Sequence, residues 1–223
     1  SNLGLLVEQA GAGRTAPAIE KAVHGGEIPL SFAQQRLWFL DQLAPNNSFY
    51  NIPGALELSG TLDLKVFEQS IAEIVRRHEA LRTTFAKTKG KPRQIIHDEF
   101  NGKVENIDLT NIPEQEQKSH VEQLATAEAK KPFDLEQGPL FRVILATLSD
   151  SKHVVIFNMH HIISDGWSVG VLVNEFAELY DAYSHRRESP LIELPVQYSD
   201  FAVWQRNWLQ GEELDRQLDF WKE

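Results

Sequence analysis

Residues able to do acid–base chemistry gather in one short stretch, residues 158–168. Two adjacent histidines, His160 and His161, are followed by Asp165 and Gly166. Imidazole is the side chain most often used as a general base. In an extended segment adjacent side chains point to opposite sides, so only one of the two rings can face a given cavity. Asp165 is placed to hold the turn, through either a charge pair or backbone hydrogen bonds.

A strand and a helix are predicted to position this stretch. The apolar run 154–159 predicts a strand, and the residues after Ser168 predict a helix. A strand that enters a helix through a polar, glycine-containing turn brings side chains and free backbone N–H groups to one place. The helix prediction depends on an apolar face with a period of about 3.6 residues; its members are Val169, Leu172, Val173, Phe176, Leu179, Tyr180 and Tyr183.

The rest of the chain predicts strands that are covered by helices. The runs 140–148 and 154–159 are apolar on both faces, which is typical of central strands. Residues 50–59 predict another strand, in which Pro53-Gly54 indicates a bulge or an edge position. Residues 82–87 and 93–96 predict a hairpin, and a weaker strand pattern occurs at 104–109.

Helix signals separate these strands. Ser31 and Asp63 are expected to cap two amphipathic helices, and residues 113–131 predict a polar surface helix. Ser199-Asp200 is expected to cap a helix with Phe201, Trp204 and Trp208 on one face, and a helical pattern then runs to the last residue. Residues 185–195 predict a loop.

Composition excludes several classes of protein. The 223 residues carry a formal net charge of −10, which disfavours nucleic-acid binding. No apolar run of about 18 residues predicts a membrane span, and no signal-peptide pattern opens the chain. The sequence has no cysteine, which excludes disulfides, cysteine nucleophiles and thiolate metal sites, and we expect a cytoplasmic protein.

The first 26 residues differ in composition from the rest. Residues 3–8 form a short apolar–polar run, and residues 11–26 are rich in Gly, Ala and Pro. This segment is interpreted either as a disordered terminus or as the joint to a preceding domain.

The pattern His-His-x-x-x-Asp-Gly resembles the active-site motif of acyltransferases such as chloramphenicol acetyltransferase and the condensation domains of nonribosomal peptide synthetases. Four stretches resemble the first four core motifs of a condensation domain, in the family's order; they are residues 31–38, 77–85, 159–168 and 198–205. Later motifs of that family are absent, so the resemblance implies the first half of the domain.

The resemblance implies an α/β fold of the α+β sandwich kind, a chloramphenicol acetyltransferase-like lobe in which helices cover a mixed sheet. The chain would hold the first of two lobes and the start of the crossover into the second. Residues 1–26 would be the tail of a carrier protein and a linker, 27–185 the N-terminal lobe, and 186–223 the connection to the missing C-terminal lobe.

Condensation domains join two substrates that are carried as thioesters on phosphopantetheine arms, and the resemblance assigns roles accordingly. His161 is expected to face a tunnel between the lobes and to act as general base, with the backbone of Gly166 near the acyl oxygen. His160 is interpreted as structural and Trp167 as core or tunnel wall. Asp165 is expected to be buried and paired with Arg82, or alternatively Arg77.

The same resemblance implies partners. They are the upstream and downstream carrier proteins, the adenylation domain of the same module and the missing C-terminal lobe. The chain itself is expected to bind no metal and no cofactor, because 4′-phosphopantetheine arrives on the carriers. The sequences of residues 162–164 and 51–53 resemble those of the subtype that joins two L-residues.

Three other functions compete with condensation. An epimerisation domain shares the histidine motif and fold. A metal site could be built from His160, His161 and Asp165, although tandem histidines at a strand end do not easily bind one ion. A non-catalytic docking module for carrier proteins is the third. The isolated chain is expected to be inactive because the tunnel needs both lobes.

Overall fold

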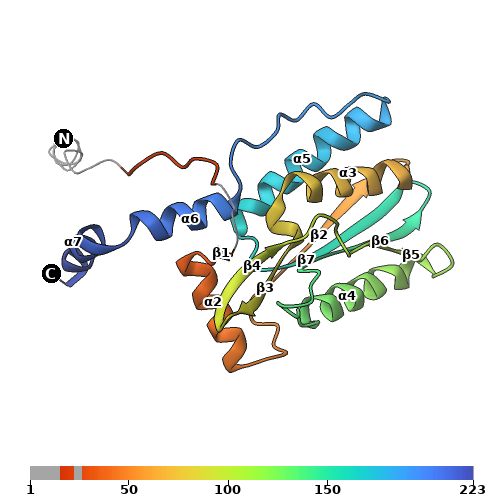
Figure 1. Ribbon diagram of the computed structural model, residues 1–223. Helices are drawn as coiled ribbons and strands as arrows, with labels where there is room; N and C mark the ends of the chain where they lie inside the picture. The colour runs from red at the N-terminus through yellow and green to blue at the C-terminus, as the bar shows by residue number, and fades with distance from the viewer. Residues whose placement is uncertain (1–15, 23–26, 223) are drawn as a thin grey trace, which may run out of the picture.

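The computed structural model describes residues 16–22 and 27–222, and its centre is a mixed four-stranded sheet between two layers of helices (Figure 1). The strand order is β2-β7-β6-β5. Strand β5 runs parallel to β6, and the other neighbours are antiparallel. The four strands are β2 (Asn51–Ser59), β5 (Val104–Asp108), β6 (Phe141–Ser149) and β7 (Lys152–His160).

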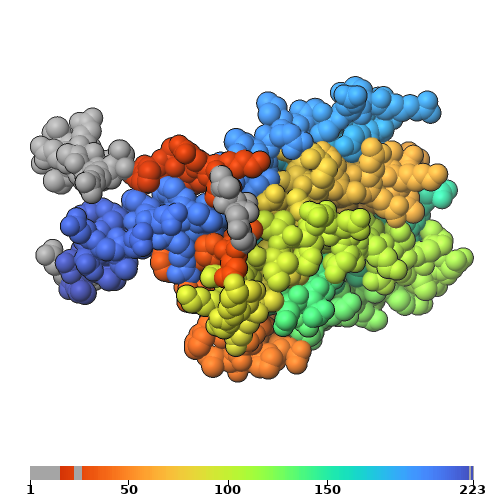
Figure 2. Space-filling model, viewed as in Figure 1, coloured from red at the N-terminus to blue at the C-terminus, as the bar shows by residue number. Residues whose placement is uncertain are grey.

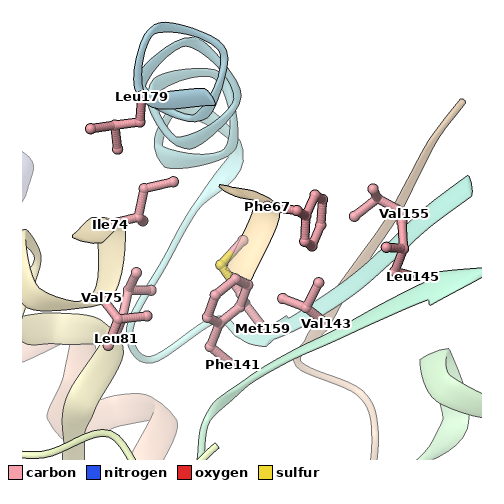
Figure 3. Close-up of a cluster of buried hydrophobic side chains, with 10 residues drawn as sticks. All are labelled: Phe67, Ile74, Val75, Leu81, Phe141, Val143, Leu145, Val155, Met159 and Leu179. Carbon is pink, nitrogen blue, oxygen red and sulfur yellow. The ribbon is translucent and has the colours of Figure 1, made fainter. Parts of the chain in front are cut away.

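Helices cover both faces of this sheet, as expected for strands that are apolar on both sides. Helices α3 (Leu64–Arg77) and α5 (Gly166–Ser184) lie on one face, and α4 (Glu114–Lys130) lies on the other. Figure 3 shows the core beneath α3 and α5, a cluster that includes Phe67 and Leu179 from the helices and Met159 from β7. On the other face of the sheet, residues of β6 and β7 pack with Leu124 and its neighbours on α4. The prediction of two central strands is therefore confirmed.

Strand β2 is an edge strand and contains Pro53 without a break in its pairing to β7. Proline is tolerated at an edge because the missing backbone N–H faces away from the sheet. Gly54 lies opposite Phe157, and a Cβ at this position would be 2.1 Å from the aromatic ring. Gly60 ends the strand with a positive φ of 113°.

Two helices begin at the N-cap residues that the sequence predicted, and two begin at other residues. Ser31 caps α2 (Phe32–Leu43), and Asp63 caps α3 by accepting backbone N–H groups. Helix α5 begins at Gly166, earlier than its apolar face indicated, because Asp165 caps it. Helix α6 (Tyr198–Trp208) is capped by Gln197 rather than by Ser199-Asp200.

A smaller sheet packs beside the main one. It has the order β1-β4-β3, from β1 (Ile28–Pro29), β3 (Thr83–Thr88) and β4 (Lys91–Ile96), and β3 and β4 form the predicted hairpin. A short 3-10 helix, η1 (Glu79–Arg82), joins α3 to β3. A second apolar cluster, with Leu37, Phe85 and Ile162 among its members, connects α2 and this sheet to the turn after β7.

Three side chains from strands hold the C-terminal end of α4. The amide of Asn158 donates to the Glu128 carbonyl at 2.7 Å, and that of Asn51 donates to the carbonyls of Ala129 and Lys131 at 2.8 and 3.0 Å. Arg142 on β6 donates to the Lys131 carbonyl at 2.8 Å and also bonds the Glu128 carboxylate. These donors replace the glycine cap that many helices use.

Helices α6 and α7 (Gly211–Lys222) extend away from the sandwich, and residues 16–22 run along α6 (Figures 1 and 2). The Trp204 indole donates to the Pro17 carbonyl at 2.8 Å, and the Ala22 N–H donates to Asp200 at 2.9 Å. The part of the expected linker at 16–22 therefore packs on the domain, whereas 1–15 and 23–26 lie outside the described residues. Phe201, Trp204 and Trp208 stack successively on one face of α6, as predicted.

Gly54→Ala should lower the free energy of unfolding by about 1–3 kcal/mol, because the added methyl group overpacks against the ring of Phe157. Gly170→Ala is the matched control. It places the same group on α5 where nothing lies within 4 Å, and should stabilise by about 0.5–1 kcal/mol through helix propensity. Urea unfolding of both variants measures the difference; equal effects would contradict the close contact at Gly54.

Candidate active site

The motif residues lie in the turn between β7 and α5. Strand β7 ends at His160 and α5 begins at Gly166. The backbone of this turn is tied to neighbouring elements, because the His161 N–H donates to the Tyr50 carbonyl at 2.8 Å and the His160 N–H donates to the Leu140 carbonyl at 3.0 Å. A turn fixed in this way presents its side chains in defined directions.

The two histidines have opposite environments. His161 is exposed, whereas His160 is 4% exposed. The His160 ring lies near Tyr50 and Phe133, with ring centroids 6.2 and 6.1 Å away. One ring is therefore available to a reactant and the other is part of the packed interior.

Burial keeps His160 neutral. Burial, with a smaller contribution from the neighbouring His161, lowers the pKa of His160 to about 4. Its Nδ1 accepts the Ile162 N–H at 3.1 Å, so the proton of the neutral ring is on Nε2. His160 thereby fixes the peptide that follows His161.

The predicted burial and pairing of Asp165 are wrong. Asp165 is exposed, and its carboxylate accepts the Ser168 N–H at 2.9 Å and the Ser168 hydroxyl at 2.7 Å. The hydrogen bonds from Ser168 lower the pKa of Asp165, with a smaller contribution from His161. A carboxylate at a helix N-terminus is stabilised by free N–H groups and by the helix dipole, so it needs no arginine.

Both candidate arginines have other partners. Arg77 is buried and pairs with Glu175 on α5 at 3.3 Å, and it donates to the Ile192 carbonyl at 3.0 Å. Arg82 bonds the His97 carbonyl and lies 3.7 Å from Glu79. Neither guanidinium is therefore paired with Asp165.

Glu175 was not identified from the sequence, although it joins α3 to α5. His78 Nε2 lies 2.8 Å from its carboxylate, in addition to the Arg77 pair. Burial alone would raise the pKa of Glu175, but hydrogen bonds from Arg77 and His78 outweigh this effect and lower the pKa. The signal that could have identified Glu175 is its position next to Phe176, which belongs to the apolar face of α5.

Gly166 and Trp167 are both exposed at the start of α5. A Cβ at Gly166 would meet nothing within 4 Å, so no neighbour described here requires a glycine, and the proposed backbone contact to an acyl oxygen stays a prediction. Trp167 is 85% exposed, so its assignment to the core is wrong. Its place in a tunnel wall stays a prediction.

Gln34 is a second residue that sequence reasoning missed. It is 2% exposed, and its amide donates to the Ile162 carbonyl at 3.3 Å. The signal was a glutamine three residues before Leu37, on the buried side of an amphipathic helix. A buried amide there must find hydrogen-bond partners, and one of them is the turn that carries His161.

A cavity of about 580 Å³ lies between α5 and the sheet. Its lining is mostly apolar and includes Met159 and Val169, which flank the turn, and Phe157, Phe176 and Tyr180 further along. His161 is exposed and is not among the residues that line this cavity.

Among residues 16–22 and 27–222, no group of three or more His, Cys, Asp or Glu side chains could hold a metal ion. Over the same ranges, no helix has both the length and the apolar character to cross a membrane.

The family model described as "Condensation domain" matches residues 24–223. The chain belongs to the condensation-domain family. It is 45% identical over 220 residues to one subunit of the linear gramicidin synthase of Brevibacillus parabrevis, and 50% identical over 196 residues to another subunit of the same synthase. These comparisons cover 99% and 88% of the chain but only 3% and 4% of the two relatives.

Solved structures agree with this family and fold. The X-domain in the complex of the X-domain and OxyB from teicoplanin biosynthesis matches with a TM-score of 0.81 and 27% identity, over 93% of this chain and 45% of that one. The starter condensation domain of rhizomide synthetase matches with a TM-score of 0.80 and 21% identity, over 88% of this chain and 47% of that one. The condensation-domain chain described here thus spans about half of the solved relatives, and the prediction of a half-domain of this fold is confirmed.

Acidification should destabilise this condensation domain through His160. An unfolded histidine has a pKa of about 6.5, whereas the folded state holds that of His160 at about 4, so the unfolded state binds more protons between these values. Stability should fall by about 2 kcal/mol between pH 7.5 and pH 5. Urea unfolding at both pH values measures it, and His160→Asn should remove this part of the loss.

His185→Gln is the control for that measurement, because it removes a ring that is 66% exposed and should leave the acid-dependent loss in place. An equal loss in the parent protein and in His160→Asn would contradict the assignment.

Asp165→Ala should lower the free energy of unfolding by only about 1 kcal/mol, as for other N-caps, and Asp165→Ser should retain most of it. Arg77→Met should cost about 3–5 kcal/mol, because it leaves the carboxylate of Glu175 without its buried cation. Thermal or urea unfolding compares the variants. If Asp165→Ala lowered the free energy of unfolding as much as Arg77→Met does, Asp165 would belong to a buried ion pair, and the exposed position described here would be contradicted.

Proposed function

We propose that this chain is the N-terminal half of a domain that forms an amide between an upstream acyl or peptidyl thioester and a downstream aminoacyl thioester. The observation that carries the proposal is the exposed ring of His161, on a fixed strand–helix turn in a chain of the condensation-domain family. Residues 27–185 form the lobe, and residues 186–223 lead toward the second one.

In this reaction the amine of the downstream substrate attacks the upstream thioester carbonyl. A C–N bond forms, the C–S bond breaks and the carrier thiol leaves. An α-amino group has a pKa of about 7.7–8.0, so an appreciable fraction is already neutral near pH 7. The thioester is already activated, so bringing the two substrates together supplies the largest part of the rate, up to about 7–11 kcal/mol.

His161 supplies the base in this proposal. Its ring accepts a hydrogen bond from the attacking amine and takes the proton as the C–N bond forms, which typically contributes about 10²–10⁴-fold. The backbone N–H of Gly166, the first residue of α5 and exposed, would favour negative charge on the acyl oxygen in this proposal. Asp165 holds this helix start in place through Ser168.

The substrates come on other proteins or domains. Relatives are named as gramicidin synthase subunits and as a phosphinothricin tripeptide synthetase. These names support upstream and downstream carrier proteins, each with a phosphopantetheine arm, and an adenylation domain as partners. The missing lobe closes the tunnel over His161. The 223-residue chain alone is therefore expected to be inactive.

A binding module is the second candidate. The match to an X-domain that was solved in complex with OxyB favours it, because that relative is bound to another protein. An epimerisation domain is a third function with the same motif, and it would move a proton at an α-carbon and leave no new amide.

The test is single-turnover amide formation by the complete domain with both carriers loaded. His161→Ala should lower the rate constant about 10²–10⁴-fold, because it removes the base. His120→Ala, which removes a histidine on the other helical layer, is the control and should keep the parent rate.

Near-parent rates for His161→Ala would refute the general-base role. A parent domain that binds loaded carriers and makes no amide would favour the binding module. Chiral analysis of the recovered aminoacyl groups separates epimerisation from condensation, because only epimerisation inverts the α-carbon.

A further inference from the structure

Gln34 connects the first helix of the lobe to the turn that carries His161. Its Oε1 accepts the Ser31 N–H at 3.0 Å, and its Nε2 donates to the Ile162 carbonyl and to Gln94 Oε1, each at 3.3 Å. The side chain is 2% exposed, so water does not compete for these bonds. All the polar atoms of this amide have partners from three different parts of the chain.

The orientation of the Gln34 amide is determined by its neighbours. Gln94 is itself buried and donates to the Pro29 carbonyl at 2.8 Å, so its oxygen is directed at the Gln34 nitrogen. The Ser31 N–H requires an acceptor on the other side. Only one orientation of the Gln34 amide satisfies both, and it directs N–H toward Ile162.

Both backbone groups of Ile162 are occupied as a result. Its N–H donates to His160 Nδ1 at 3.1 Å and its carbonyl accepts from Gln34, while the His161 N–H donates to the Tyr50 carbonyl at 2.8 Å. The peptides on either side of His161 are thus held, and the imidazole keeps only its own side-chain torsions. The Ile162 side chain is buried beside Leu37 and Phe85, which adds packing to the polar contacts.

We propose that Gln34 is a positioning residue for His161: its bond to the Ile162 carbonyl sets the backbone from which the imidazole reaches the reacting amine. The proposal rests on the proposed function, in which His161 acts on that amine. A misplacement of about 1 Å at a reacting group can lower a rate about 10²-fold, so a tether far from the chemistry has a measurable effect.

Gln34→Met tests the tether, because methionine keeps the approximate size of glutamine and removes the donor. The assay is single-turnover amide formation by the complete domain with loaded carriers, expressed per folded molecule. We expect the rate constant to fall about 10–100-fold.

Gln117→Met is the matched control. Gln117 is also buried, and its amide donates to the carbonyls of Leu109, Ile112 and Leu148 on the α4 side of the sheet, away from the turn. The Gln117→Met variant should lose stability to a similar degree as Gln34→Met and should keep the rate constant of the parent protein. If Gln34→Met keeps the parent rate, or if Gln117→Met is slowed equally, the positioning role is overturned.

A double-mutant cycle with His161→Ala separates positioning from a general structural effect. If Gln34 acts through the imidazole, Gln34→Met should cause no further loss once His161 is alanine. Losses that multiply overturn the proposal. Near-parent activity of His161→Ala alone would instead refute the general-base function, so the two failures are distinguishable.

Gln34→Glu decides the question if Gln34→Met yields too little folded protein. The introduced carboxyl can still accept the Ser31 N–H, but it donates to the Ile162 carbonyl only when protonated, and burial raises its pKa. The rate relative to the parent should therefore rise as the pH is lowered from about 8 to about 6. A ratio that does not change with pH contradicts the tether.

Discussion

The end of a strand that is buried on both faces determines this candidate site. Strand β7 packs α3 and α5 on one side and α4 on the other, so each of its residues is committed to one layer. His160 is the last residue of the strand and belongs to the buried set. His161 is the first residue beyond it and faces outward. Two chemically identical side chains thereby acquire different access to reactants.

Polar groups from distant parts of the sequence then fix the turn that follows. Gln34 comes from α2, Tyr50 from the residue before β2, and Asp165 from the end of the turn itself. Arg77 and Glu175 join α3 to the middle of α5, so the helix that begins at the site is anchored along its length. Each of these interactions gives a partner to a backbone group or to a charged side chain that would otherwise lack one. Polar side chains occur in this otherwise apolar sandwich for that reason.

Much of the architecture could be predicted from the sequence because local signals dominate it. Ser31 and Asp63 cap helices by bonding residues two or three positions away, and Pro53 marks an edge strand through its own missing N–H. Strand periodicity places the two histidines on opposite sides, and the exposure of His161 follows from its position just beyond the end of β7. The role of residues 27–185 as one lobe stays a prediction.

The partners of charged side chains could not be predicted in the same way. Asp165 carries the sequence signature of both a helix cap and a buried ion-pair partner, and only the position of α3 against α5 shows that Arg77 reaches Glu175 instead. Trp167 was interpreted as core or tunnel wall, but it is exposed on the first turn of α5. Gln34 shows the same difficulty, because a helical period identifies a buried position without identifying its hydrogen-bond partner.

The end of α4 has a consequence for which parts of the lobe can move. Asn51, Asn158 and Arg142 hold its last carbonyls from three neighbouring strands. Sliding α4 along the sheet would remove the donors from three of its last carbonyls at once, among them the buried bond to the Glu128 carbonyl, which is unfavourable. Helix α4 and the sheet should therefore move as one rigid body. Conformational fluctuations of the lobe should be confined to the opposite helical layer, where α5 borders the cavity.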